Sequence, residues 1–152
     1  MLIYVDDKLY SANILEIWET DEEKGLSVKE LKEKYTTYAK FQFIKNPPLV
    51  LLNSDTGWRI EVTSKIVKEW WKKSRTRNRI IAIQLLERMI KTAVLLETTK
   101  DAKNTPGIES VSEFGNRCKI NGELHNVRVI TKKQPGRHFA YYYGAISIEK
   151  GQ

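Results

Sequence analysis

The sequence predicts an α+β fold in which helices pack on one face of a C-terminal three- or four-stranded antiparallel sheet, with a small N-terminal β-hairpin and helix region. Helical spacing of apolar residues dominates the middle of the chain, and strand-like alternation dominates the last third. With 152 residues, of which 41% are hydrophobic, the chain is long enough to bury one substantial core. We therefore expect one domain over residues 1–152, made of an N-terminal accessory segment (1–57) and a helix-plus-sheet core (58–150).

The N-terminal region begins with a predicted hairpin. Two β-prone runs within residues 2–15 flank Asp6-Asp7-Lys8, which is a turn-forming sequence. After an acidic stretch, Ser27 and Glu30 form the S-x-x-E pattern of a capping box, which predicts a helix that runs to about Ala39.

Short strands are predicted next. Phe41–Ile44 and Leu49–Leu52 are apolar runs, and Pro47-Pro48 between them indicates a strand that is broken or bent at a sheet edge. Trp58–Val62 follows the turn-forming Ser54–Gly57 and alternates as a half-buried strand does.

Two helices follow these strands. Thr63 or Ser64 caps the first, whose apolar face consists of Ile66, Val67, Trp70 and Trp71. The second helix is predicted from Ile80 to about Thr98, and its apolar stripe marks it as the central helix of the core. The stripe consists of Ala82, Ile83, Leu86, Met89, Ile90, Ala93 and Val94.

The rest of the chain reads as a three-stranded antiparallel meander. Asn121-Gly122 is the strongest short hairpin signal, because a type I′ turn needs positive φ at both central residues. A two-residue loop there fixes the register of the first two strands. The predicted pairs are Ile120 with Glu123, Cys118 with His125 and Phe114 with Val129. Gln134–Arg137 forms the second turn, and we expect Lys133 to pair with His138 across it.

This register sorts the side chains of the meander onto two faces. Phe114, Cys118, Ile120, Val127 and Val129 should face the long helix. The other face should carry Arg117, Lys119, Arg128 and Lys132, together with Phe139, Tyr141 and Tyr143. Lysine and arginine neutralise phosphates and aromatic rings stack on unpaired bases, so this face predicts single-stranded RNA binding. In the alternative interpretation the tyrosines pack beneath the N-terminal strands.

The charge distribution also indicates a polyanion partner. Residues 1–64 hold eight Lys/Arg against eleven Asp/Glu, whereas residues 65–152 hold eighteen against eight. A basic run between the predicted helices adds a second candidate group of nucleic-acid contacts. This run contributes Lys72, Lys73, Arg75, Arg77 and Arg79. The alternative is a solvated basic face that serves solubility.

Most enzyme and cofactor classes lack their motif in this sequence. It contains no H-E-x-x-H, C-x-x-C, G-x-S-x-G, P-loop or dinucleotide fingerprint, and Cys118 is its one cysteine. No run approaches the roughly 20 apolar residues of a membrane helix, and the N-terminus does not resemble a signal peptide. We therefore expect a cytoplasmic protein with no cofactor, no metal and no membrane partner, although the tail of a larger exported protein would look the same.

The two histidines differ in their predicted surroundings. His125 falls on the core face, where we expect a structural role. His138 opens the last strand next to Arg137, which we predict to anchor a phosphate. Metal-independent RNA cleavage needs a base for the 2′-hydroxyl, an acid for the leaving oxygen and a cation for the developing charge. His138 as general base, with Tyr141 and Arg128, could supply these groups; the alternative is a surface histidine at the start of a strand.

The order of these elements resembles a known superfamily. The resemblance rests on W-R-I-E-V-T-S-K-I-V-K, a long helix, G-I-E-S-V-S-E-F, C-K-I-N-G-E-L-H-N-V-R-V-I-T-K-K and H-F-A-Y-Y-Y-G. In this pattern the chain is similar to phage and conjugative-element domains of the barnase, EndoU, colicin and RelE-type ribonuclease superfamily and to domains of large polyvalent proteins. The resemblance implies helices on one face of a small antiparallel sheet and RNA on the other face and the last strand. The first helical region of such domains often carries a histidine, where this sequence has Arg75, Arg77 and Asn78.

Two functional hypotheses follow from these observations. In the first, the chain is an RNA-binding domain, and in its catalytic form a metal-independent endoribonuclease, of a phage or mobile element. In the alternative, it is a non-catalytic accessory module that binds a protein partner or DNA through the basic run of residues 72–79.

Overall fold

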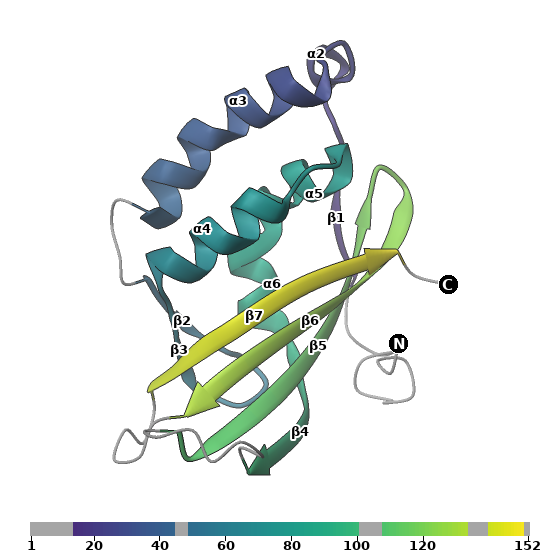
Figure 1. The fold of residues 1–152 in the computed structure, drawn as a ribbon. Helices are drawn as coiled ribbons and strands as arrows, with labels where there is room; N and C mark the ends of the chain where they lie inside the picture. The colour runs from purple at the N-terminus through teal and green to yellow at the C-terminus, as the bar shows by residue number, and fades with distance from the viewer. Residues whose placement is uncertain (1–13, 45–48, 101–107, 134–139, 151–152) are drawn as a thin grey trace.

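A computed structural model describes residues 14–44, 49–100, 108–133 and 140–150, with the backbone alone for residue 44 and for 140–150 (Figure 1). The strands are β1 (Leu15–Ile17), β2 (Leu49–Leu52), β3 (Arg59–Val62), β4 (Val94–Lys100), β5 (Ser110–Ile120), β6 (Glu123–Lys133) and β7 (Ala140–Lys150). The helices are α2 (Asp21–Lys24), α3 (Val28–Ala39), α4 (Ser64–Lys73), α5 (Arg77–Ile81) and α6 (Leu86–Thr92). A π-helical turn, η2 (Lys40–Ile44), follows α3, and a 3-10 turn, η3 (Ala82–Leu85), joins α5 to α6.

The strands form one mixed sheet of seven strands, six of which follow the order β1-β5-β6-β7-β3-β2, while β4 pairs with β5 off this path. The long strands β5, β6 and β7 form the predicted antiparallel meander. Its outer edge at β5 is shared by β4, which pairs antiparallel with Ser110–Gly115, and by β1, which pairs parallel with Cys118–Ile120. The α+β class and the helices packed on the C-terminal sheet are confirmed, and the sheet is extended beyond the meander by four short strands.

The core lies between the meander and the helical segment that runs from α5 to α6 (Figure 1). Asn121 and Gly122 have φ of 53° and 80°, as the predicted turn requires, and the predicted register of β5 and β6 is confirmed. The strand residues predicted to face the core are all fully buried; they are Phe114, Cys118, Ile120, Val127 and Val129. They contact the buried helical residues, which include Ile80, Ile83, Leu86, Met89 and Ile90.

The predicted helix starts are confirmed. Ser27 and Glu30 form the reciprocal capping box of α3, and the Thr63 hydroxyl accepts a hydrogen bond from the backbone N–H of Ile66 at the start of α4. The predicted hairpin over residues 2–15 lies almost entirely outside the described residues. No helix in the described ranges has the length and apolarity needed to cross a membrane.

Two predicted elements are wrong. The helix expected to reach Thr98 ends at Thr92, and the following residues form β4, because the β-prone Val94–Lys100 pairs with the edge of β5 at every residue except Leu96, where the register shifts. The strand expected at Phe41–Ile44 is instead the π-helical extension of α3, where Phe43 is buried against the core and makes an edge-to-face contact with Tyr38.

Part of the acidic stretch over residues 16–23 is internal. Glu19 is 8% exposed, and its carboxylate receives two hydrogen bonds from the Arg77 guanidinium, Nε to Oε1 at 3.0 Å and Nη2 to Oε2 at 2.9 Å. The same guanidinium donates to the carbonyl oxygens of Leu26 and Glu23, both at 2.7 Å. The hydrogen bonds to Arg77 lower the pKa of Glu19, so the pair is charged at neutral pH.

The turn of the β5–β6 hairpin joins this ion pair. Asn121 Oδ1 accepts from the backbone N–H of Glu19 at 2.8 Å, and Asn121 Nδ2 donates to Glu19 Oε1 at 3.0 Å and to Asn78 Oδ1 at 2.9 Å. The Trp18 ring covers the turn, since a Cβ at Gly122 would lie 3.1 Å from it. One network therefore fixes three segments that are distant in sequence: the β1–α2 connection, the start of α5 and the tip of the hairpin.

A second buried carboxylate, Glu23, joins α2 to α3 and η3. It is 2% exposed and accepts hydrogen bonds from the Thr20 backbone N–H, from the Lys34 ammonium and from the Tyr35 hydroxyl. The Tyr35 hydroxyl in turn accepts from Gln84 Nε2 at 2.7 Å. Burial alone would raise the pKa of Glu23, but these hydrogen bonds outweigh it and lower the pKa to about 2.

A carboxyl group whose pKa is lower in the folded than in the unfolded chain stabilises the fold above its unfolded pKa, and this stability is lost as pH falls toward the folded pKa. We therefore predict that Glu23→Gln lowers the free energy of unfolding at pH 6 and removes about 2 kcal/mol of the stability that the native protein loses between pH 5 and pH 3. Urea unfolding at a series of pH values measures this. Glu22→Gln, at an exposed position in the same helix, is the control and should retain the native acid sensitivity; identical pH profiles for all three proteins would contradict the assignment.

Candidate nucleic-acid interface

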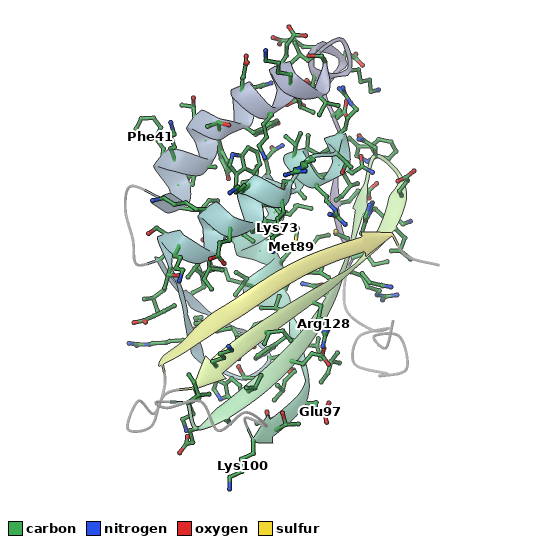
Figure 2. The ribbon with its side chains drawn as sticks, in the orientation of Figure 1. Phe41, Lys73, Met89, Glu97, Lys100 and Arg128 are labelled. Atoms are coloured by element: carbon green, nitrogen blue, oxygen red, sulfur yellow. The ribbon has the colours of Figure 1, made fainter. Side chains whose placement is uncertain are left out.

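The face of β5 and β6 that points away from the core carries the cations that the sequence placed there. Strand residues alternate between faces, and the row of buried core residues leaves the intervening positions on the other side. Lys119, Arg128 and Lys132 are exposed and Arg117 is half-buried. The structure thus brings together all four predicted contacts from these two strands, and Figure 2 shows Arg128 on this part of the sheet.

Cations and carboxylates are mixed on this face of the sheet, because the register places Glu16 of β1 beside Lys119 and Glu97 of β4 beside Glu113. Its outward positions on β5 and β6 hold four cations and one carboxylate, Glu113. The Nε of Arg128 pairs with this carboxylate, and the Arg128 side chain remains 54% exposed. Arg128 is the more exposed partner of this pair, at 54% against 19% for Glu113, so its guanidinium can also be approached by a phosphate.

The register of β7 differs from the predicted one. Lys133 pairs with Tyr141 and not with His138, and Thr131 pairs with Tyr143. Because this offset of three residues is odd, it exchanges the two faces of the strand, and the backbone positions of Tyr141 and Tyr143 fall in the row of the buried Thr131. Tyr142 instead pairs with Lys132, so it is the tyrosine position in the row of the exposed cations. The longer second turn had no residue signal that fixed its length, unlike Asn121-Gly122.

The remaining predicted catalytic and anchoring groups are only partly described. His138, Arg137 and Phe139 lie outside the described residues, and of Tyr141 and Tyr143 the backbone alone is described. His125 is buried on the core face, as predicted, with its Nδ1 2.8 Å from the Glu123 carbonyl oxygen. Within the described ranges no group of three or more potential metal ligands converges.

The basic run of residues 72–79 does not form one surface. Lys72 and Lys73 end α4, in the helical layer of the molecule (Figure 2), and Arg75 lies in the connection to α5. Arg77 turns inward to Glu19, and its guanidinium is held by four hydrogen bonds to protein atoms. Arg79 is exposed on α5. We therefore leave Arg77 out of the candidate interface. The signal that could have identified its role is the acidic stretch, which supplies its partner.

Comparison with known proteins gives one match. The family model described as large polyvalent protein-associated domain 3 matches residues 27–142, which is more than half of the chain. The match covers α3 and β2, which the sequence had assigned to an accessory segment, and it confirms the resemblance to domains of large polyvalent proteins. No curated protein and no solved structure matches the chain.

Proposed function

The chain belongs to the family of large polyvalent protein-associated domain 3, and on that premise we propose that it is an RNA-binding domain of a phage or mobile element that holds a single strand on the face of β5, β6 and β7 opposite the core. The observation that carries the proposal is the row of Arg117, Lys119, Arg128 and Lys132 on the face opposite the core. Cations on the outer face of a sheet can follow a phosphate backbone while the strands hold them at fixed spacing.

The arrangement favours a single strand over a duplex. Arg117 and Arg128 are diagonal neighbours on adjacent antiparallel strands, since Arg117 pairs with Asn126 and Arg128 with Gly115. Diagonal side chains are about 7 to 8 Å apart, so these two cations can contact neighbouring phosphates of one chain. Tyr142, which the register brings to the row of Lys132, is the tyrosine position we propose for base stacking on this face, in place of Tyr141 and Tyr143. Stacking on aromatic rings requires unpaired bases.

Salt dependence tests the interface. Each phosphate contact on a single strand contributes about 0.7 to the slope of log affinity against log salt concentration. We predict that Lys119→Gln with Lys132→Gln lowers the magnitude of this slope by about 1.4 for a fluorescent oligouridine, measured by anisotropy between about 50 and 200 mM salt. Lys65→Gln with Lys68→Gln, at exposed positions on α4, is the matched control with the same loss of charge and should keep the native slope.

Two outcomes would remove the sheet face from RNA binding. One is native affinity that does not change across this salt range, since contacts with several phosphates must weaken. The other is an equal loss of slope in both double variants, which would assign the effect to net charge and not to the face.

The catalytic form of the proposal assigns a general base to His138, with Arg128 to stabilise the charge that develops on phosphorus; Tyr141, in the row of the buried Thr131, is left out of it. The proposal predicts that the protein cleaves RNA in EDTA and that His138→Ala lowers the cleavage rate by about 100-fold or more. The measurement is single-turnover cleavage of an end-labelled RNA. Absence of cleavage by the native protein, or equal cleavage by both proteins, would leave an RNA-binding domain without this catalytic role for His138.

A further inference from the structure

A groove in the helical layer lies away from the sheet face. It has a volume of about 500 Å³ and runs between the first turns of α3 and the junction of α4 with α5. Its lining includes Val28, Lys29, Lys32, Lys72, Arg75 and Ile80. The volume falls within the roughly 300 to 1,000 Å³ range of sites that bind ligands or inserted side chains.

The groove is strongly basic. Four cations line it, and Glu33 is its one acidic lining residue. Within the described part of the chain, no hydrogen bond or ion pair engages the side-chain ends of Lys29, Lys72 or Arg75. Three cations are therefore available to a ligand on the walls of one groove.

The fourth cation of the groove, Lys32, is fixed by contacts within the protein. Its ammonium donates to the carbonyl oxygens of Trp71 and Ser74 at the end of α4 and lies 3.9 Å from the centroid of the Trp71 ring. Burial lowers the pKa of Lys32, and the nearby Arg75 lowers it further. The groove therefore has positive potential that its own residues leave uncompensated, and an anion that enters would be favoured.

The base of the groove is apolar. Two aliphatic residues line the groove: Val28, which is 40% exposed, and Ile80, which is buried. The aliphatic stems of the lysines extend the apolar surface toward the charged rim. Among the described residues that line the groove, none is aromatic. A nucleic acid would use the cations but would find no ring on which to stack its bases, and it would leave the apolar base unused.

We propose that this groove binds an acidic segment of a partner protein, which inserts an aliphatic side chain against Val28 and Ile80 and places carboxylates against Lys29, Lys72 and Arg75. The complementarity is both of charge and of polarity, since the carboxylates meet the cationic rim and the aliphatic side chain meets the base. The inference does not rest on the proposed RNA function, because the groove and the outer face of the sheet are formed by different layers of the molecule. The alternative hypothesis assigned residues 72–79 to a protein partner or DNA, and this proposal names an acidic peptide segment as the ligand of Lys72 and Arg75 in that run.

Fluorescence anisotropy with a labelled synthetic peptide tests this proposal. The probe carries glutamates on both sides of a central leucine; one matched peptide replaces the leucine with serine and another replaces the glutamates with glutamines. We expect saturable binding of the probe, and binding weaker by about tenfold or more for either matched peptide. This pattern requires the apolar and the anionic part of the ligand together.

Protein variants locate the site. Lys72→Glu with Arg75→Glu should weaken binding of the probe by about tenfold or more, and Val28→Ser, at an exposed position, should weaken it with no change of charge. Lys65→Glu with Lys68→Glu reverses two charges elsewhere on the exposed surface of α4 and should change the affinity less than about twofold. Equal midpoints of thermal unfolding establish that each variant is folded.

The proposal is overturned if the native protein does not bind the probe saturably, or if both double variants lose affinity equally. It is also overturned if the groove variants lose affinity for an oligouridine and not for the peptide, because the groove would then be a nucleic-acid surface. The salt-slope experiment on the sheet face is unaffected by these results, so failure of one proposal is distinguishable from failure of the other.

Discussion

The bidentate pair between Arg77 and Glu19 is the constraint on which the arrangement of this protein depends. Both groups are withdrawn from bulk water to a large extent, and a carboxylate buried in this way is tolerated only with a charged partner of good geometry. The guanidinium satisfies this need and also bonds two carbonyl oxygens near α2, while Asn121 bonds Glu19 from the hairpin tip. The start of the central helix, the N-terminal segment and the meander are therefore held in one relative position.

This constraint decides which cations remain available to a ligand. Of the basic run, Arg77 is used internally, while Lys72 and Arg75 line a groove beside α3. The cations of β5 and β6 lie on the other layer because their strands turn every second side chain toward α6. The basic C-terminal half thus presents two separate surfaces. The sheet face is regular and suits a repeating phosphate backbone; the groove has an apolar base and suits a carboxylate-bearing peptide.

The parts of the fold that followed from the sequence are those with a local chemical cause. The positive φ needed at Asn121 and Gly122 fixed the register of β5 and β6, and the Ser27–Glu30 capping box fixed the start of α3. The parts that did not follow depend on distant partners. Ala93 and Val94 continue the helical stripe locally, but pairing with β5 decides the conformation of Val94–Lys100. The register of β7 could not be predicted because no residue pattern fixes the length of the connection from β6 to β7. The role of Arg77 depends on Glu19, which lies 58 residues away in the sequence.

A double-mutant cycle between Glu19 and Arg77 tests the central claim most directly. The free energy of unfolding in urea is measured for the native protein, Glu19→Gln, Arg77→Met and the double variant. If the pair fixes the three segments, each single variant leaves a buried group without its partner, and the coupling energy should be about 2 kcal/mol or more. A coupling energy below about 0.5 kcal/mol, with additive effects of the two substitutions, would contradict the account.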